Sequence, residues 1–184
     1  MAETTPEAAQ KGMDEFHMMI GYCVAAWADV DQHLFEIFSD AIGSRDQCAI
    51  LYYRTPGLDV RLKTTDEIVR SVLPKKERAS GGHDHPDVVA WKKTREGFED
   101  LLSERRRIAH HQVGVAVYFD ESGNSHKTAF EIFMSYQERL RGRGSPDESL
   151  GIEDLRLHLA NVRGLQSRLS DFCERVMKRP LQPK

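Results

Sequence analysis

Apolar side chains recur at steps of three and four residues in three long stretches of the chain, which is the spacing of amphipathic helices. The first stretch begins near Met13 and ends near Gly43. The second follows Asp87, a residue type that caps helix N-termini, and reaches about His111. The third covers about 155–176 and ends before a proline. The pattern therefore predicts two long helices and a further C-terminal helix.

The remaining patterned segments are shorter. Helices are predicted at 45–54 and at about 58–72, separated by a Pro-Gly pair that stops the first of them. A β-hairpin is predicted at about 113–136. Its first strand carries apolar residues at alternate positions from Val113 to Phe119, and its second strand is rich in β-branched and aromatic residues.

These elements predict a mostly α fold, a helical bundle with two long antiparallel helices and an inserted β-hairpin. A chain of 184 residues has the size of one domain, which we place at 13–179. Residues 1–12 contain Pro, Gly and small polar residues without periodicity, so a disordered N-terminal tail is expected. Residues 180–184 are expected to form a C-terminal tail.

Composition and charge narrow the class of protein. With 26 Lys and Arg against 29 Asp and Glu, the formal net charge is -3, which excludes a strongly basic nucleic-acid coat but not a local basic site. No apolar run approaches the roughly 20 residues of a membrane-spanning helix, and the N-terminus is acidic, so a cytoplasmic protein without membrane contact is expected. The three cysteines are an odd number without a close pair, which predicts reduced thiols.

One segment concentrates residues that can do chemistry. The sequence LLSERRRIAHH at 101–111 ends the second long helix and holds three arginines and two histidines. On a helix, Arg105 lies within roughly 40° of the apolar stripe, so it needs an acidic partner from the first long helix. The partners considered are Asp29, Asp31 and Glu36. One interpretation is therefore a structural ion pair, with the histidines helping to satisfy the last carbonyls of the helix.

The run ERRRIAHH at 104–111, in a helical chain whose first long helix contains AAWADVDQHLFEIF, resembles the HEPN superfamily. That superfamily is marked by an arginine followed after four to six residues by a histidine, often as RNxxAH. Arg105 takes the place of the arginine and His110 that of the histidine, with Ile108 and Ala109 as the small apolar pair. The motif covers six residues, and the order of elements over about 13–111 and the last helix supports it.

The resemblance implies a metal-independent endoribonuclease of the toxin or defence type, without cofactor or metal, in which Arg105 and His110 are catalytic. It also implies a homodimer with a shared cleft, an RNA substrate and a cognate antitoxin. Arg106, where active members often have Asn or Asp, and His111 are then substrate-binding residues. The pair Arg106 and His111 has the same spacing, so both registers stay open.

The superfamily also contains non-catalytic members that use the same helices for dimerisation and partner binding. The alternative function is therefore a dimeric HEPN-like interaction module. In that module Arg105 is a structural ion-pair residue, and Asp31 is a candidate partner for it.

Overall fold

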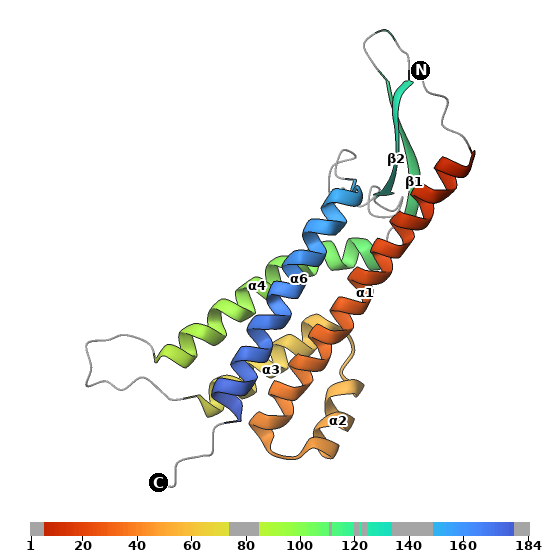
Figure 1. Ribbon diagram of the computed structural model, residues 1–184. Coiled ribbons are helices and arrows are strands. Elements are labelled where there is room, and N and C mark those ends of the chain that lie inside the picture. Colours follow the sequence, from red (N-terminus) through yellow and green to blue (C-terminus); the bar gives the residue numbers. More distant parts are fainter. Residues whose placement is uncertain are drawn as a thin grey trace, which may run out of the picture. The chain divides into compact units, whose positions relative to one another are not determined.

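The computed structural model describes residues 6–73, 85–110, 112–119, 122, 125–133 and 149–178 (Figure 1). The elements in chain order are α1 (Pro6–Ile42), α2 (Arg45–Arg54), α3 (Leu58–Val72), α4 (Pro86–His110), β1 (Gln112–Phe119), β2 (Ser125–Phe133), α6 (Ile152–Phe172) and the π-helical turn η1 (Cys173–Met177). The described part of the chain is mostly helical with a small antiparallel hairpin, which confirms the predicted class. None of the helices in these ranges is long and apolar enough to cross a membrane.

The helix boundaries follow from local sequence chemistry. α2 and α3 have the predicted bounds, and Gly57 between them adopts a φ of +79° that favours glycine. α1 ends before Gly43, whose φ is +89° and whose N–H donates to the Ser39 carbonyl at 2.8 Å. The start of α1 differs from the expected position near Met13. Pro6 occupies the first helical position, where a missing N–H costs nothing, and Glu7 complements the helix dipole.

The described residues form two compact units. Unit 1 comprises those up to Ala25 and those from Ser103 to Asn161, and unit 2 comprises Ala26–Leu102 and the residues from Val162 onward. α1, α4 and α6 each contribute residues to both units. That 13–179 forms a single domain stays a prediction.

In unit 2, the long helices pack through buried aromatic side chains. Trp27 of α1 meets Phe98 of α4 edge-on, with ring centroids 5.5 Å apart. Trp91 of α4 lies 5.1 Å from Phe172 of α6. All four aromatic side chains are buried. Unit 2 therefore has the apolar core that the helical stripes of the sequence predict.

In unit 1, the hairpin packs beside the N-terminal half of α1 and the start of α6. Its strands pair antiparallel, from Gln112 opposite Phe133 to Val117 opposite Thr128. Ile132 of β2 exchanges two backbone hydrogen bonds with Leu150, of 2.9 and 3.1 Å. The core of this unit consists of Phe16, Cys23, Ile108, Ile132, Leu150, Leu155 and Leu159. The hairpin confirms the predicted one, whose last residues, 134–136, lie outside the described residues.

Candidate active site

The arginine and histidine cluster lies in the last turns of α4, within unit 1. Ile108 is buried and ties this end of the helix to the core. Arg105 is half-buried, Arg106 is exposed, and each has an interaction partner, as does Arg107. His110 is the last residue of α4 and is exposed. The first register of the motif thus combines a partly sequestered guanidinium with an accessible imidazole.

The helix geometry separates the two motif side chains. Five residues along an α-helix correspond to a rise of roughly 7.5 Å and a rotation of about 140°. The difference in exposure between Arg105 and His110 agrees with this rotation. The two groups of one chain therefore point to different sides of α4. His111 of the second register lies outside the described residues, so the choice between registers stays open.

A buried histidine fastens the same end of α4 to α6. Nδ1 of His158 lies 2.6 Å from Oε2 of Glu104, the residue before Arg105, and the His158 side chain is only 1% exposed. Burial lowers the pKa of His158, and the hydrogen bond to Glu104 opposes that effect in part. No motif in the sequence singles out His158. The available signal is its position between Leu155 and Leu159 on the apolar stripe of the last helix.

A cleft of about 510 Å³ opens elsewhere in unit 1, between α1, the hairpin and the start of α6. Phe16 and Phe130 give it an apolar wall. Its charged lining residues are Glu15, Glu131, Glu153 and Asp154. No described residue of the α4 cluster lines this cleft. Because carboxylates repel phosphate, the arginine-rich end of α4 is the better candidate for a nucleic-acid contact.

Glu131 is the most buried acid of that cleft, with 6% of its surface exposed. The Tyr118 hydroxyl, from the neighbouring strand, donates a short hydrogen bond to it. This hydrogen bond raises the pKa of Tyr118. At the rim, Arg156 bridges Glu15, at 2.6 Å, and Glu153. These contacts join the residues that line the cleft to one another. They fix the positions of the carboxylates of Glu15, Glu131 and Glu153.

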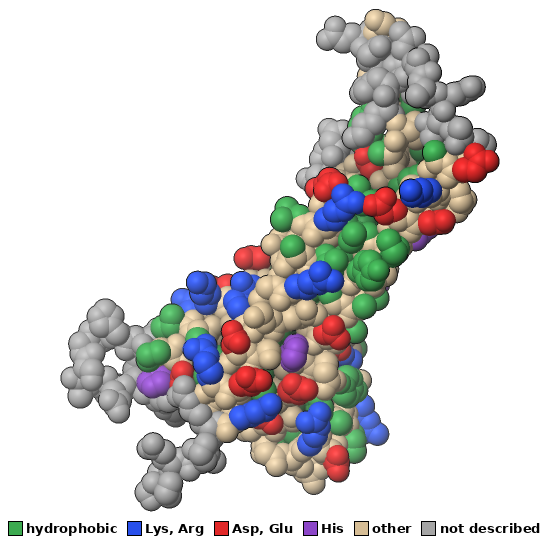
Figure 2. All heavy atoms as spheres, viewed as in Figure 1, with side chains coloured by type: hydrophobic (Ala, Val, Ile, Leu, Met, Phe, Trp, Pro, Cys, Tyr) green, Lys and Arg blue, Asp and Glu red, His purple; other side chains and the backbone are tan. Residues whose placement is uncertain are grey.

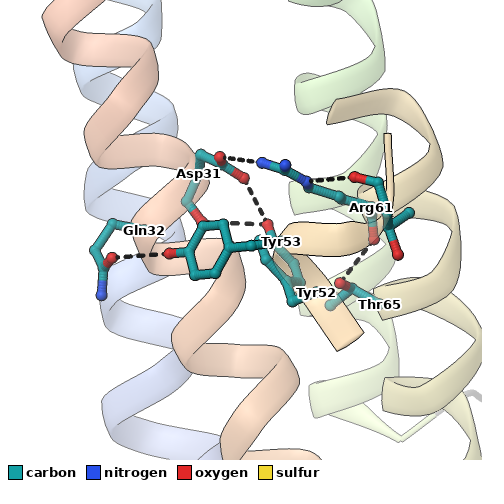
Figure 3. Close-up of polar contacts among 7 residues, drawn as sticks. Asp31, Gln32, Tyr52, Tyr53, Arg61 and Thr65 are labelled. Atoms are coloured by element: carbon teal, nitrogen blue, oxygen red, sulfur yellow. Dashed lines mark hydrogen bonds and ion pairs between the residues drawn. The ribbon is translucent and has the colours of Figure 1, made fainter. Parts of the chain in front are cut away.

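Asp31, the candidate partner of Arg105, lies in unit 2, within a polar network that joins α1, α2 and α3 (Figure 3). Its Oδ2 is 2.6 Å from Nη1 of Arg61, and its Oδ1 accepts a 2.7 Å hydrogen bond from the Tyr52 hydroxyl. The Arg61 guanidinium also lies over the Tyr52 ring, 5.2 Å from its centroid. Burial and the bond to Asp31 raise the pKa of Tyr52. Both carboxylate oxygens of Asp31 therefore have partners here, and its pairing with Arg105 stays a prediction.

Apart from Asp31, the residues of this network could not be found from the sequence. Arg61 and Tyr52 belong to no motif and come from separate helices, so only the packing of α2 and α3 on α1 brings them together. Tyr53 adds a 3.3 Å hydrogen bond to Gln32 at the edge of the network. Since these groups satisfy one another, we assign the network a structural role.

Among the described residues, no group of three or more His, Cys, Asp or Glu side chains is placed to hold a metal ion. Cys23, Cys48 and Cys173 are buried free thiols. Burial raises the pKa of Cys173 to about 12, so it is a poor nucleophile at neutral pH. Comparison of the chain with protein-family models, curated proteins and solved structures gives no match.

Proposed function

We propose that this chain is a HEPN-like, metal-independent endoribonuclease that uses Arg105 and His110. The observation that carries the proposal is the position of these residues. His110 is exposed at the C-terminal end of α4, and a half-buried arginine precedes it by five residues within a basic cluster. A histidine with only a role in capping its own helix would not require an arginine cluster beside it.

The two side-chain types can together cleave RNA. Histidine is the side chain most often used as a general base at neutral pH, and here it can take the proton of a ribose 2′-hydroxyl. The 2′-oxygen then forms a bond to phosphorus, and the bond from phosphorus to the 5′-oxygen breaks. That oxygen receives a proton from an imidazolium or from water. The products are a 2′,3′-cyclic phosphate and a 5′-hydroxyl.

Arg105 has a separate part in this scheme. Its guanidinium can donate two parallel hydrogen bonds to the non-bridging phosphate oxygens, on which charge builds in the transition state. Arg105 and His110 of one helix diverge by about 140°. A second copy of the motif would therefore supply, from the opposite side of the phosphate, the arginine or histidine that the first copy directs elsewhere. This geometry agrees with the shared cleft of two protomers that the resemblance implies. Arg106, which is exposed, would contact a neighbouring phosphate.

The assay is cleavage of a mixture of structured and single-stranded RNAs in EDTA. His110→Ala and Arg105→Ala should each lower the rate by about a hundredfold or more, the range typical of a lost general base or charge stabiliser. His17→Ala, an exposed histidine of α1, is the matched control and should retain full activity. Loss of cleavage with Arg106→Ala and His111→Ala, but not with Arg105→Ala and His110→Ala, would assign the second register instead.

The second candidate is a non-catalytic dimeric interaction module with Arg105 as a structural ion-pair residue. The specific observation in its favour is that Arg105 is half-buried and has an interaction partner. In that case Arg105→Ala lowers the free energy of unfolding by a few kcal/mol, because it leaves an acidic group unpaired. His110→Ala would then have little effect, and no RNA would be cleaved. Thermal melting of both variants beside the cleavage assay separates the two functions.

A further inference from the structure

The cleft of unit 1 is a second candidate site, and the RNA chemistry proposed above does not use it. It lies between α1, the hairpin and the start of α6, and all of its described lining residues belong to unit 1. Its volume of about 510 Å³ is within the range of about 300–1,000 Å³ that is typical of small-molecule sites. The cleft is therefore large enough for a small organic ligand.

The charged side chains that line the cleft are all acidic. No lysine or arginine is among its described lining residues. The acidic ones come from three elements: Glu15 of α1, Glu131 of β2, and Glu153 and Asp154 of α6. Arg156 at the rim pairs with Glu15 and Glu153 and offsets part of this charge. The remaining negative charge favours a cationic ligand and disfavours a phosphate or a carboxylate.

Glu131 carries this negative charge into the interior. It lines the cleft and is almost fully buried. Its Oε1 accepts the hydrogen bond of the Tyr118 hydroxyl, a neutral partner, and no basic side chain of the described chain pairs with it. Acidic side chains are rarely so buried unless a positive group lies close by, because an uncompensated charge away from water is costly. A cation in the cleft would compensate the charge of Glu131.

The carboxylates do not converge on one point. Among the described residues, no three His, Cys, Asp or Glu side chains are placed to hold one metal ion together. The wall beside them is aromatic, since Phe16 and Phe130 both line the cleft with ring centroids 6.4 Å apart. Aromatic rings offer methylene groups an apolar contact and attract ammonium groups to their faces. Separated carboxylates beside such a wall favour several positive charges joined by an aliphatic chain.

We propose that the cleft binds a linear polyamine, with one ammonium group against Glu131 and a methylene chain against Phe16 and Phe130. A second ammonium group reaches the carboxylates at the start of α6. Each ammonium donates hydrogen bonds to carboxylate oxygens, and the chain removes apolar ring surface from water. The inference goes beyond the proposed function, and binding is measured on the chain without RNA.

The first experiment is calorimetric titration of the wild-type chain, free of RNA and at low salt, with spermidine and separately with hexaamminecobalt(III). Both probes are trivalent cations, but only spermidine has methylene chains. Spermidine should bind with a Kd below about 1 mM. It should bind at least about fivefold more tightly than the cobalt complex, because its methylene groups pack against the rings. No binding of spermidine, or equal binding of the two probes, would overturn the proposal.

Glu131→Gln tests the buried carboxylate. Glutamine has nearly the same shape and its amide oxygen can still accept the Tyr118 hydrogen bond, but it carries no charge. The substitution should weaken spermidine binding by about tenfold or more. Asp14→Asn is the matched control, since Asp14 is exposed on α1 in the same unit, does not line the cleft and changes the net charge equally. Equal losses in the two variants would indicate general charge attraction and overturn the proposal.

The second experiment uses the wild-type chain, so it stays decisive if Glu131→Gln disturbs the hairpin. Nuclear Overhauser effects should connect the methylene protons of spermidine to the ring protons of Phe130. They should be absent at Tyr22, an exposed tyrosine of α1 that belongs to the same unit and does not line the cleft. Contacts at Tyr22 as strong as at Phe130, or none at Phe130, would contradict the proposed site.

Discussion

Single polar residues at the end of α4 attach it to α6 and carry the chemistry that we propose for it. Glu104 reaches back to the buried His158, while Arg105 and His110 follow on other sides of the same helix. The sequence identifies the cluster because arginine and histidine gather in a few positions. It could not identify Glu104 and His158 as partners, because the two are 54 residues apart and only the packing of α6 on α4 joins them.

The lowered pKa of His158 makes stability depend on pH. In the unfolded chain the imidazole has its ordinary pKa of about 6.5, whereas burial keeps it neutral to lower pH in the folded state. Below about pH 6.5 the unfolded state therefore binds more protons, and the free energy of unfolding falls as the pH drops. The melting temperature should decrease between about pH 7.5 and about pH 5.5.

His158→Gln is the variant that isolates this effect, because glutamine can still bond to Glu104 but does not titrate. It should melt at a lower temperature than wild type at neutral pH and should lose less stability on acidification. The control is His17→Ala, whose imidazole is exposed. If His158→Gln keeps the full pH dependence of the wild type, the buried pair is not its source.

The hydrophobic periodicity predicts most of the helices well. The bounds of α2 and α3 are the predicted ones, because a Pro-Gly break lies between two periodic segments. The start of α1 was predicted too late, since periodicity reports which residues face a core and says little about an exposed first turn. The alternation in β1 predicted a strand, but a period of two does not tell which side of the strand faces the protein.

Two glycines should respond oppositely to alanine, because their backbone conformations differ. Gly43 has a φ of +89° at the end of α1, so Gly43→Ala should lower the free energy of unfolding by about 1 kcal/mol. Gly164 lies within α6, and a Cβ there would meet nothing within 4 Å. Gly164→Ala should therefore raise the free energy of unfolding by roughly 0.5–1 kcal/mol. Urea unfolding of both variants measures the two changes in the free energy of unfolding. Changes of the same sign and size would contradict the different backbone conformations of the two glycines.

Asp66 joins α3 to α4 and should be among the most sensitive polar positions of unit 2. Its buried carboxylate accepts 2.8 Å hydrogen bonds from Trp91 Nε1 and Arg70 Nε and lies 3.1 Å from Nη1 of Arg95. Asp66→Ala leaves these donors unpaired and should lower the free energy of unfolding by about 3 kcal/mol.

The neighbouring Glu67 is exposed and provides the control for Asp66. Glu67→Ala should change the free energy of unfolding by less than about 0.5 kcal/mol. Urea denaturation of the two variants in one buffer compares them directly. If Asp66→Ala lowers the free energy of unfolding no more than Glu67→Ala does, the Asp66 carboxylate does not hold α3 to α4.

Positive and negative charges are nearly balanced over the chain. The chain has a formal net charge of -3, and acidic and basic side chains are interspersed over the helices on the face drawn in Figure 2. Any affinity for RNA must therefore come from a local cluster, and the end of α4 provides three adjacent arginines. Composition predicts this balance, but it cannot predict that four acidic residues of unit 1 line a separate cleft.

The salt dependence of RNA binding tests whether the arginines at the end of α4 make most of the phosphate contacts. Each phosphate contact to single-stranded RNA contributes about -0.7 to the slope of log affinity against log salt concentration, so three arginines predict a slope near -2. Arg106→Ala should make the slope shallower by about 0.7. Arg163→Ala, an exposed arginine of α6, should leave it unchanged. A much steeper slope in the wild type would mean that RNA contacts an extended surface instead.

We propose that His110 acts in RNA cleavage without a metal, and the chemical nature of the product ends distinguishes this mechanism from others. Oligonucleotides cut in EDTA by the wild-type chain and by His110→Ala should be analysed by mass spectrometry. We expect a 2′,3′-cyclic phosphate and a 5′-hydroxyl from the wild type, and intact RNA with His110→Ala. Ends with a 5′-phosphate, cleavage that persists in His110→Ala, or intact RNA with both proteins would contradict the proposed mechanism.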